Sequence, residues 1–288
     1  MILFTFCFLL FTFYFLFFST PVFAWGPGVH LFIGRTILNS PSLISSQLCQ
    51  LLNQYWIDFL YGCIICDFFI GKGMLKRLSA ERWDIGFSML FDSSSKQQTA
   101  FSYGFLSHLA NDVIAHNFFI PSFIIREKTT NRLGHLNCEI TADHFVEKLV
   151  LNDMKIVIKD YCSLNDAFLL RHAKKRKIFF NLRKKMFLET MSAYYFSKYK
   201  NFIKNQFLKL KKRPGIDEIK KYIEYSLFCS IDILKNRDKS QLISYDPTGL
   251  DFLKLTRKLK KIYKKDPAQK LFVTPSHIKK ISIFDRKI

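Results

Sequence analysis

Glycine and proline are scarce in this chain of 288 residues, which holds 11 Gly and 8 Pro against 32 Phe. A fold made of many short strands needs frequent turns rich in these two residues, so their scarcity argues against an all-β architecture. Apolar residues recur instead at helical spacing over long stretches. The sequence therefore predicts an all-α, multi-helix bundle, with helices expected at residues 40–66, 99–118, 135–154, 165–210, 217–235 and 250–265. We expect Pro121 to end the second of these helices, because proline lacks the N–H that the next helical hydrogen bond needs.

Several common catalytic signatures are also missing. No Ser-His-Asp or Cys-His arrangement stands out, and no glycine-rich phosphate loop follows an expected strand. Cys63 and Cys66 form a Cys-x-x-Cys pair, but no second pair follows, so a structural zinc site built from four cysteines is not expected. We expect these cysteines to be buried as small apolar side chains.

Negative charge is scarce in one half of the chain. The formal net charge is +21, and residues 151–288 carry all of it, because residues 1–150 hold ten basic and ten acidic side chains. Such a basic half either contacts anionic lipid or nucleic acid, or consists of lysine-rich solvated helix faces. The change in charge predicts a boundary near residue 150, between a core at residues 25–150 and a basic helical region at residues 151–288 that packs on the core or extends it.

The first 24 residues have the composition of a targeting segment, although no Lys or Arg precedes their apolar run. Residues 1–18 are almost wholly apolar, Pro21 breaks the run, and the residues up to Ala24 resemble a small-residue cleavage site. We predict a signal peptide at residues 1–24 that is removed before Trp25, and hence a secreted or periplasmic protein. The apolar run is also long enough to remain uncleaved as a membrane anchor.

Histidine and carboxylate residues recur at spacings of four in two expected helices. His108, Asp112 and His116 lie one turn apart, and steps of four advance about 40° round a helix, so the three side chains share one face. His135 and Glu139 repeat the spacing. Imidazole nitrogen and carboxylate oxygen are the usual ligands of catalytic zinc, and a carboxylate between two histidines is able to bridge two metals. The alternative is a set of hydrogen-bonded or surface pairs without a metal.

Five sequence blocks resemble the zinc-dependent phospholipase C family, and they follow one another in that family's order. The blocks are residues 25–30, 61–69, 82–90, 104–121 and 135–143, and the first reads Trp25-Gly-Pro-Gly-Val-His30. The resemblance implies an all-α fold of the phospholipase C/P1 nuclease type. It also implies a cofactor of up to three Zn2+ ions held in one cluster.

The resemblance assigns ligands to the first two metals. Trp25 would bind through its α-amino nitrogen and main-chain carbonyl, which requires removal of the preceding residues, and His30 would share that metal. Asp112 would bridge it to a second metal, held by Asp67 and His108.

A third metal would be held by His116, His135 and Glu139, with Asp143 behind the ligands to orient a histidine. One position departs from the family pattern, because Glu81 stands where the family has a histidine, and residues 31–107 contain none. Glu81 either supplies a carboxylate oxygen to the second metal, or the site holds two metals, favours another divalent ion or is inactive.

The activity implied by the resemblance is hydrolysis of phospholipids by a metal-activated water. Zinc lowers the pKa of bound water from about 15.7 toward about 7, and Asp67 is the expected catalytic base. The expected partners are a phospholipid or other phosphodiester and, through the basic half, an anionic membrane surface. A phospholipase D outcome would use the same site on the other ester bond.

Two alternatives belong to other functional classes. A zinc nuclease of the S1/P1 type, acting on single-stranded nucleic acid, shares the Trp25 and His30 start, and the net charge of +21 favours it. Its last metal pair is typically His-x-x-x-Asp, whereas here His135 is followed by Glu139, so nucleic acid ranks second. The other alternative is a non-catalytic, metal-stabilised surface protein, in which Glu81 marks the loss of activity.

Overall fold

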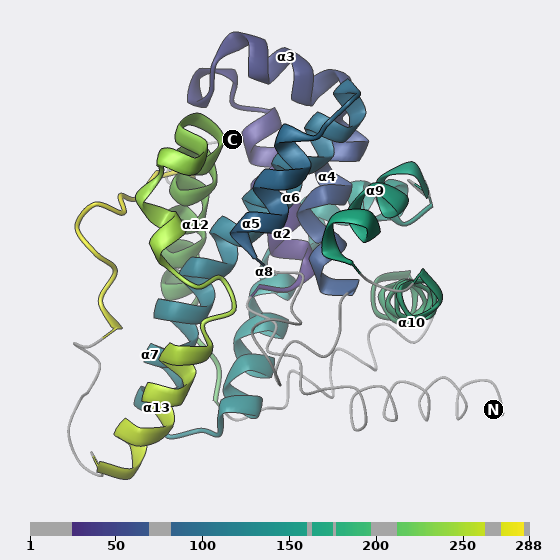
Figure 1. Ribbon diagram of the computed structural model, residues 1–288. Coiled ribbons are helices and arrows are strands. Elements are labelled where there is room, and N and C mark those ends of the chain that lie inside the picture. Colours follow the sequence, from purple (N-terminus) through teal and green to yellow (C-terminus); the bar gives the residue numbers. More distant parts are fainter. Residues whose placement is uncertain are drawn as a thin grey trace, which may run out of the picture.

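The computed structural model describes residues 25–68, 82–159, 163–174, 177–196, 212–262 and 272–284. Within these ranges the chain is helical and contains no strand, which confirms the predicted all-α class (Figure 1). The α-helices are α2 (Pro27–Leu38), α3 (Ser46–Gln54), α4 (Trp56–Ile65), α5 (Trp83–Phe91), α6 (Lys96–Ile114), α7 (Ile120–Arg126), α8 (Asn131–Lys159), α9 (Ser163–Ala173), α10 (Lys177–Phe196), α12 (Ile216–Asn236) and α13 (Leu250–Ile262). Short 3-10 turns are η2 (Pro41–Leu43), η3 (Cys66–Phe68), η6 (Arg237–Lys239) and η7 (Gln241–Ser244), and η5 (Ala115–Phe119) is a π turn.

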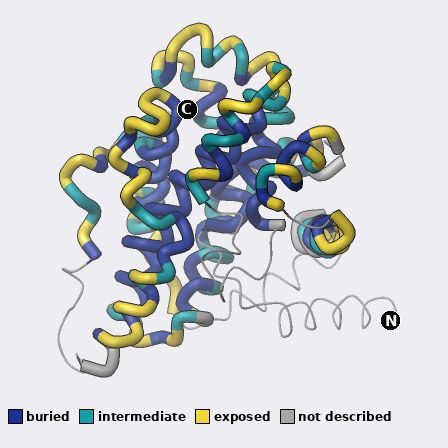
Figure 2. Tube along the Cα trace, viewed as in Figure 1, coloured by how far each residue is buried: buried dark blue, intermediate teal, exposed yellow. Residues whose placement is uncertain are grey.

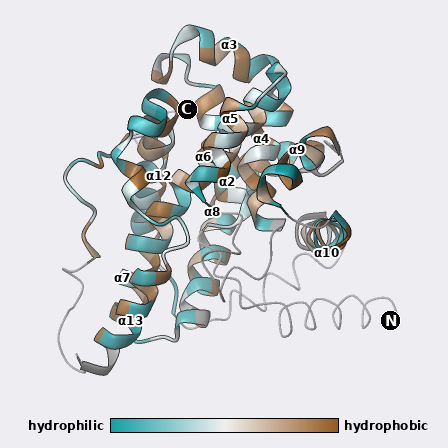
Figure 3. Ribbon diagram, in the orientation of Figure 1, coloured by the Kyte–Doolittle hydropathy of each residue, from teal (hydrophilic) through white to brown (hydrophobic). Residues whose placement is uncertain are grey.

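Helix α6 runs through the centre of the molecule. It packs against α4, α12 and α5 and also touches α2, and every residue from Ala100 to Ile114 is buried (Figures 1 and 2). Outer helices such as α13 bury one face, and Figure 3 shows hydrophobic and hydrophilic residues alternating along it. Polar side chains on α6 therefore lie in the core, where each needs a partner.

The helix that begins in α6 does not end at Pro121, so that prediction is wrong. It continues through the π turn η5 into α7 and ends at Arg126. Proline cannot donate a helical hydrogen bond, and its ring collides with the carbonyl four residues earlier. In the π turn the Ile120 N–H bonds to the Ala115 carbonyl, five residues back, and this wider turn accommodates the proline.

Two other expected helices are divided. The stretch at residues 40–66 forms α3 and α4, separated at Tyr55, whose φ of −118° and ψ of 43° lie outside the helical region. The stretch that begins at residue 165 forms α9 and α10, and residues 197–210 lie outside the described part of the chain. Helix α8 runs without a break through residue 150. The division of the chain at that residue stays a prediction.

No helix in the described part of the chain is long and apolar enough to span a bilayer. Residues 1–24 lie outside the described residues, so the signal peptide, its cleavage and the secreted location stay predictions.

Candidate metal centre

Two helices bring His30, His108 and Asp112 together in the core. His30 comes from α2, and the other two lie one turn apart on α6. One ligand atom from each residue lies within 4.8 Å of the others, and all three side chains are at most 1% exposed. His30 Nε2 lies 3.3 Å from one Asp112 oxygen, and His108 Nε2 lies 3.1 Å from the other. The imidazole rings are stacked, with centroids 3.9 Å apart, and each ring turns its Nε2 toward a different oxygen of Asp112, as two ligands sharing a bridging carboxylate would.

A close crossing of α4 and α6 fixes His108. Gly62 and Gly104 meet where the helices cross, and a Cβ added to either would collide with the backbone of the other helix. The small residues bring the Cys63 carbonyl, near the end of α4, to 2.8 Å from His108 Nδ1. A carbonyl only accepts hydrogen bonds, so Nδ1 carries a proton, and Nε2 is the nitrogen turned to Asp112. A backbone carbonyl behind a histidine is the usual arrangement for a metal ligand.

Asn111 and Ser230 lie behind His30. The Asn111 amide nitrogen is 3.4 Å from His30 Nδ1, and the Ser230 hydroxyl from α12 donates to Asn111 Oδ1 at 2.6 Å. With this orientation the amide donates to Nδ1, and the His30 proton lies on Nε2, toward Asp112. With the amide turned over, Oδ1 accepts from Nδ1–H, and Nε2 is ready to bind a metal. Asn111 therefore determines which ring nitrogen of His30 carries the proton, and the sequence patterns gave no sign of this role.

Burial and the neighbouring charges shift the pKa of Asp112 in opposite directions, and the same is true of the pKa of His108. Burial alone would raise the pKa of Asp112, but His108 and His30 hold it well below its usual value. Burial alone would lower the pKa of His108, but Cys66 and Asp112 together raise it well above its usual value. Asp67 adds to this rise. The core thus holds a carboxylate in its charged form, and a buried carboxylate of this kind needs a cation beside it.

Asp143 binds the N-terminus of α2, the helix that carries His30. Its carboxylate, on α8, accepts hydrogen bonds from the backbone N–H groups of Gly28 (3.2 Å) and Val29 (3.0 Å). The first N–H groups of a helix have no partner within the helix, and a negative charge there is favourable. Asp143 therefore caps α2 and positions His30 through the backbone of that helix.

Trp25 is buried at the start of α2. Its indole N–H donates to the Ser226 hydroxyl of α12 at 3.0 Å, and its ring stacks on Phe119 with centroids 4.9 Å apart. These contacts hold the side chain in place, while binding of a metal through the Trp25 main chain stays a prediction.

A second pair of histidines lies in the core. His116 is in the π turn η5 and His135 is on α8, and their ring centroids are 5.7 Å apart. His116 Nδ1 donates to the Pro247 carbonyl at 2.6 Å, which leaves Nε2 as its metal-binding nitrogen. Gly249 follows with φ +57°, and a Cβ there would collide with His116. A turn of the basic half of the chain thus orients a histidine of the predicted core.

The remaining predicted ligands are near these groups but are not brought into one cluster with them. Asp67 lies in η3, is 1% exposed and acts electrostatically on His108. Glu139 is partly buried, one turn after His135 on α8. Among the described residues, the group of His30, His108 and Asp112 is the only one of three or more such side chains whose ligand atoms all lie within 4.8 Å of one another. Glu81 lies outside the described residues.

Cys63 and Cys66 are free thiols, buried completely. Burial raises the pKa of Cys63 to about 12, so it remains a neutral thiol and is a poor metal ligand and nucleophile. The burial of Cys63 agrees with its expected role as a small apolar side chain, whereas Cys66 is buried but acts electrostatically on His108.

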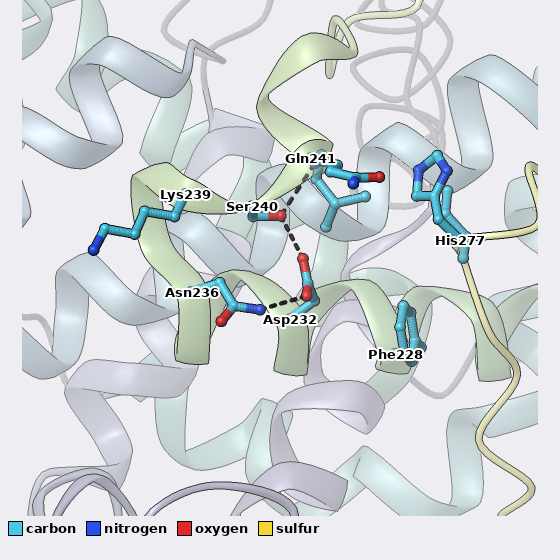
Figure 4. A pocket seen from close by; sticks show the side chains of 9 residues that line it. Phe228, Asp232, Asn236, Lys239, Ser240, Gln241 and His277 are labelled. Atoms are coloured by element: carbon cyan, nitrogen blue, oxygen red, sulfur yellow. Dashed lines mark hydrogen bonds between the residues drawn. The ribbon is translucent and has the colours of Figure 1, made fainter.

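A separate hollow of about 280 Å³ lies beside the C-terminal end of α12 (Figure 4). There Asp232 accepts hydrogen bonds from the Asn236 amide at 2.7 Å and from the Ser240 hydroxyl. The residues that line this hollow include none of the predicted metal ligands, so it is not part of the metal centre.

The described structure is thus an all-α protein with a buried His–His–Asp group, to which α2 contributes His30 and the central helix α6 contributes the other two residues. This donor set is typical of zinc hydrolases. The family model for zinc dependent phospholipase C matches residues 29–209, more than half of the chain. The chain therefore belongs to the zinc-dependent phospholipase C family, which confirms the resemblance of the sequence blocks. The match extends past those blocks and includes α9 and α10. No curated protein and no solved structure matches the chain significantly.

The residues present fit a zinc ion. Two imidazoles and one carboxylate are zinc ligands by type, and a cation among them would balance the buried charge of Asp112. The hydrogen bond from His108 to the Cys63 carbonyl already selects the ring nitrogen that a metal requires.

Proposed function

We propose that the protein is a zinc-dependent phosphodiesterase that hydrolyses phospholipids in the manner of a phospholipase C. The observation that supports this most directly is the buried group of His30, His108 and Asp112 in a member of the zinc-dependent phospholipase C family. We also propose that the chain acts outside the cytoplasm, after removal of residues 1–24. The apolar run and the small-residue motif before Trp25 support that location.

The proposed ligands of the first two metals are the main chain of Trp25, His30, Asp112, His108 and Asp67. The two oxygens of Asp112, one near His30 Nε2 and the other near His108 Nε2, support a bridging role for this carboxylate. The electrostatic effect of Asp67 on His108 supports a place for Asp67 beside the second metal.

The proposed third metal is held by His116, His135 and Glu139, and the approach of the two rings to 5.7 Å supports it. Glu81 remains our candidate for an additional ligand. The number of ions, two or three, depends on whether Glu81 binds.

The chemistry divides between the metal and the side chains. Zinc, when bound, acidifies water and offsets negative charge on a phosphodiester. Asp67 is the proposed base, since a buried carboxylate next to the metal ligands is able to accept a proton from the attacking water. Asp112 and the carbonyl of Cys63 hold His108 in one orientation and one tautomer. The packed core keeps other water away from these groups.

The experiment measures zinc content and hydrolysis on the same purified chain. We expect two or three zinc ions per chain by elemental analysis, and release of phosphocholine from phosphatidylcholine that stops with a chelator. Asp112→Asn removes the bridging charge and is expected to lower activity at least about 100-fold. Asp217→Asn is the matched control, because Asp217 is fully exposed at the start of α12.

Other outcomes would point to the alternatives. A chain that contains no zinc after expression in zinc-supplemented medium contradicts the proposed centre. Release of choline in place of phosphocholine would indicate a phospholipase D. Hydrolysis of single-stranded DNA without hydrolysis of lipid would indicate a nuclease, and zinc without turnover of either would indicate a non-catalytic surface protein.

A further inference from the structure

Helix α10 exposes a contiguous apolar surface. Ile178 is 73% exposed, Phe179 56% and Leu182 57%. Leu182 lies four positions after Ile178 and three after Phe179, and residues at these spacings are neighbours on a helix surface, so the three side chains form one patch within about one turn. Single exposed apolar side chains are common on soluble proteins, but contiguous ones mark contact sites. We call these three residues the α10 patch.

The exposure of the α10 patch is fixed by contacts on the opposite side of the helix. Lys184 is 5% exposed, bonds to Asp166 of α9 at 2.6 Å, and lies over the Tyr61 ring of α4 at 4.9 Å. Phe180 and Phe187 are buried on the same side as Lys184. In Figure 2 the exposed part of α10 accordingly faces away from the other helices. These buried contacts fix the orientation of α10, so the α10 patch faces solvent.

The α10 patch lies on a helix that touches the candidate metal centre. Helix α10 packs against η3 (Cys66–Phe68), and η3 carries Asp67, the proposed base. Helix α10 would thus lie between a ligand bound at the patch and the segment that supplies Asp67.

Basic side chains surround the patch. Residues 163–196 hold eight Lys or Arg against two Asp or Glu. Both acidic residues pair with a lysine of α10, Asp166 with Lys184 at 2.6 Å and Glu189 with Lys185 at 4.0 Å, so the segment keeps a net positive charge. Lys177 is exposed next to Ile178, and Lys185, 75% exposed, is on the side of α10 that carries the patch. Apolar side chains among cations match a membrane surface with anionic headgroups, where the apolar groups enter the lipid and the cations meet phosphate.

We propose that the α10 patch and its surrounding lysines dock the protein on an anionic lipid bilayer. This docking deepens the proposed function and rests on it, because it brings the metal centre to phospholipid in a membrane. Nucleic acid also binds basic surfaces, but it stacks its bases on aromatic rings and gains little from Ile178 and Leu182. Lipid accounts for both the charge and the aliphatic side chains.

The test compares two variants of the full chain with the wild type. Ile178→Gln combined with Leu182→Gln removes apolar surface, and Lys185→Glu reverses one charge of the same face. Leu149→Gln is the control, because Leu149 is also an exposed leucine, 56% exposed, but is on α8. All substitutions are at exposed positions, so unchanged circular dichroism and melting temperature are expected for each.

The measurement is sedimentation with phosphatidylcholine vesicles that contain or lack 30% phosphatidylserine (about a third anionic lipid). We expect the wild type and the control to bind the anionic vesicles, and binding by both patch variants to fall at least about tenfold. Vesicle hydrolysis should fall in parallel, while hydrolysis of a monomeric short-chain phosphatidylcholine stays unchanged.

The outcomes separate this docking from the proposed activity. Patch variants that bind anionic vesicles as tightly as the wild type would overturn the docking proposal, whatever the activity. Equal loss of single-stranded DNA binding, with no vesicle binding by the wild type, would also overturn it and assign the face to nucleic acid. Loss of vesicle binding in the variants, in a chain that hydrolyses no phosphodiester, would support the docking and refute the activity.

Discussion

The crossing of α4 over α6 offers the sharpest test of how the fold builds the metal centre. Gly104→Ala adds one methyl group where the two backbones touch. The new Cβ would overlap the Phe59 carbonyl and lie 3.0 Å from both the Cys63 nitrogen and the Gly62 Cα. Because these neighbours are backbone atoms, no side chain is able to turn aside, and α4 has to move away from α6.

The size of the effect follows from three contributions. Alanine in place of glycine favours the helix by about 1 kcal/mol. Forcing the methyl group into the crossing costs about 1–3 kcal/mol. Separation of the helices also stretches the bond between the Cys63 carbonyl and His108 Nδ1, 2.8 Å long, and leaving buried partners unsatisfied costs about another 1–3 kcal/mol. The net loss in the free energy of unfolding is roughly 1–5 kcal/mol. Since Cys63 orients His108, zinc affinity should fall about 10–100-fold.

The assays are thermal unfolding of the zinc-free protein and competitive zinc titration against a chelating dye. Gly104→Ala should lower the melting temperature by roughly 2–20 °C, because each kcal/mol corresponds to roughly 2–4 °C for a chain of this size. Gly215→Ala is the matched control, since it adds the same methyl group at the start of α12 with no atom within 4 Å, at φ −69°. A Gly104→Ala protein that is as stable as the control and binds zinc as the wild type does would refute the reasoning.

The remaining predictions concern the protons of the two histidines. Since the pKa of His108 is raised in the folded protein, the stability that its proton contributes is present at low pH and is lost as the pH rises through that raised value. Zinc competes with this proton, so at pH values below the raised pKa of His108 the zinc affinity should rise about tenfold per pH unit. A zinc-induced gain in melting temperature that is the same at pH 6 and at pH 8 would contradict this prediction. Asn111→Leu removes the amide behind His30 and should weaken zinc binding about 10–100-fold in the same titration. An unchanged zinc affinity would show that Ser230 and Asn111 do not orient the His30 ring.

Much of the fold was predictable because helices have a strong local signature. Apolar spacing predicted the helical stretches, and the series of four-residue steps placed His108 and Asp112 on one face of α6, where the structure has them. Local rules failed at Pro121, which was expected to end the helix. The π turn at residues 115–119 accommodates the proline, and the packing of α7 against α8 and α13 carries the helix onward.

The sequence by itself determined which residue types are available to hold a metal, because zinc binds only a few kinds of side chain. It also placed the chain in its family through blocks in a fixed order. Only the tertiary structure decided how the histidines are oriented. The groups behind them are the backbone carbonyls of Cys63 and Pro247 and the amide of Asn111, supported by a serine from α12. Every residue has a carbonyl, so a carbonyl leaves no motif in the sequence, and its position beside an imidazole is set by how closely the helices pack.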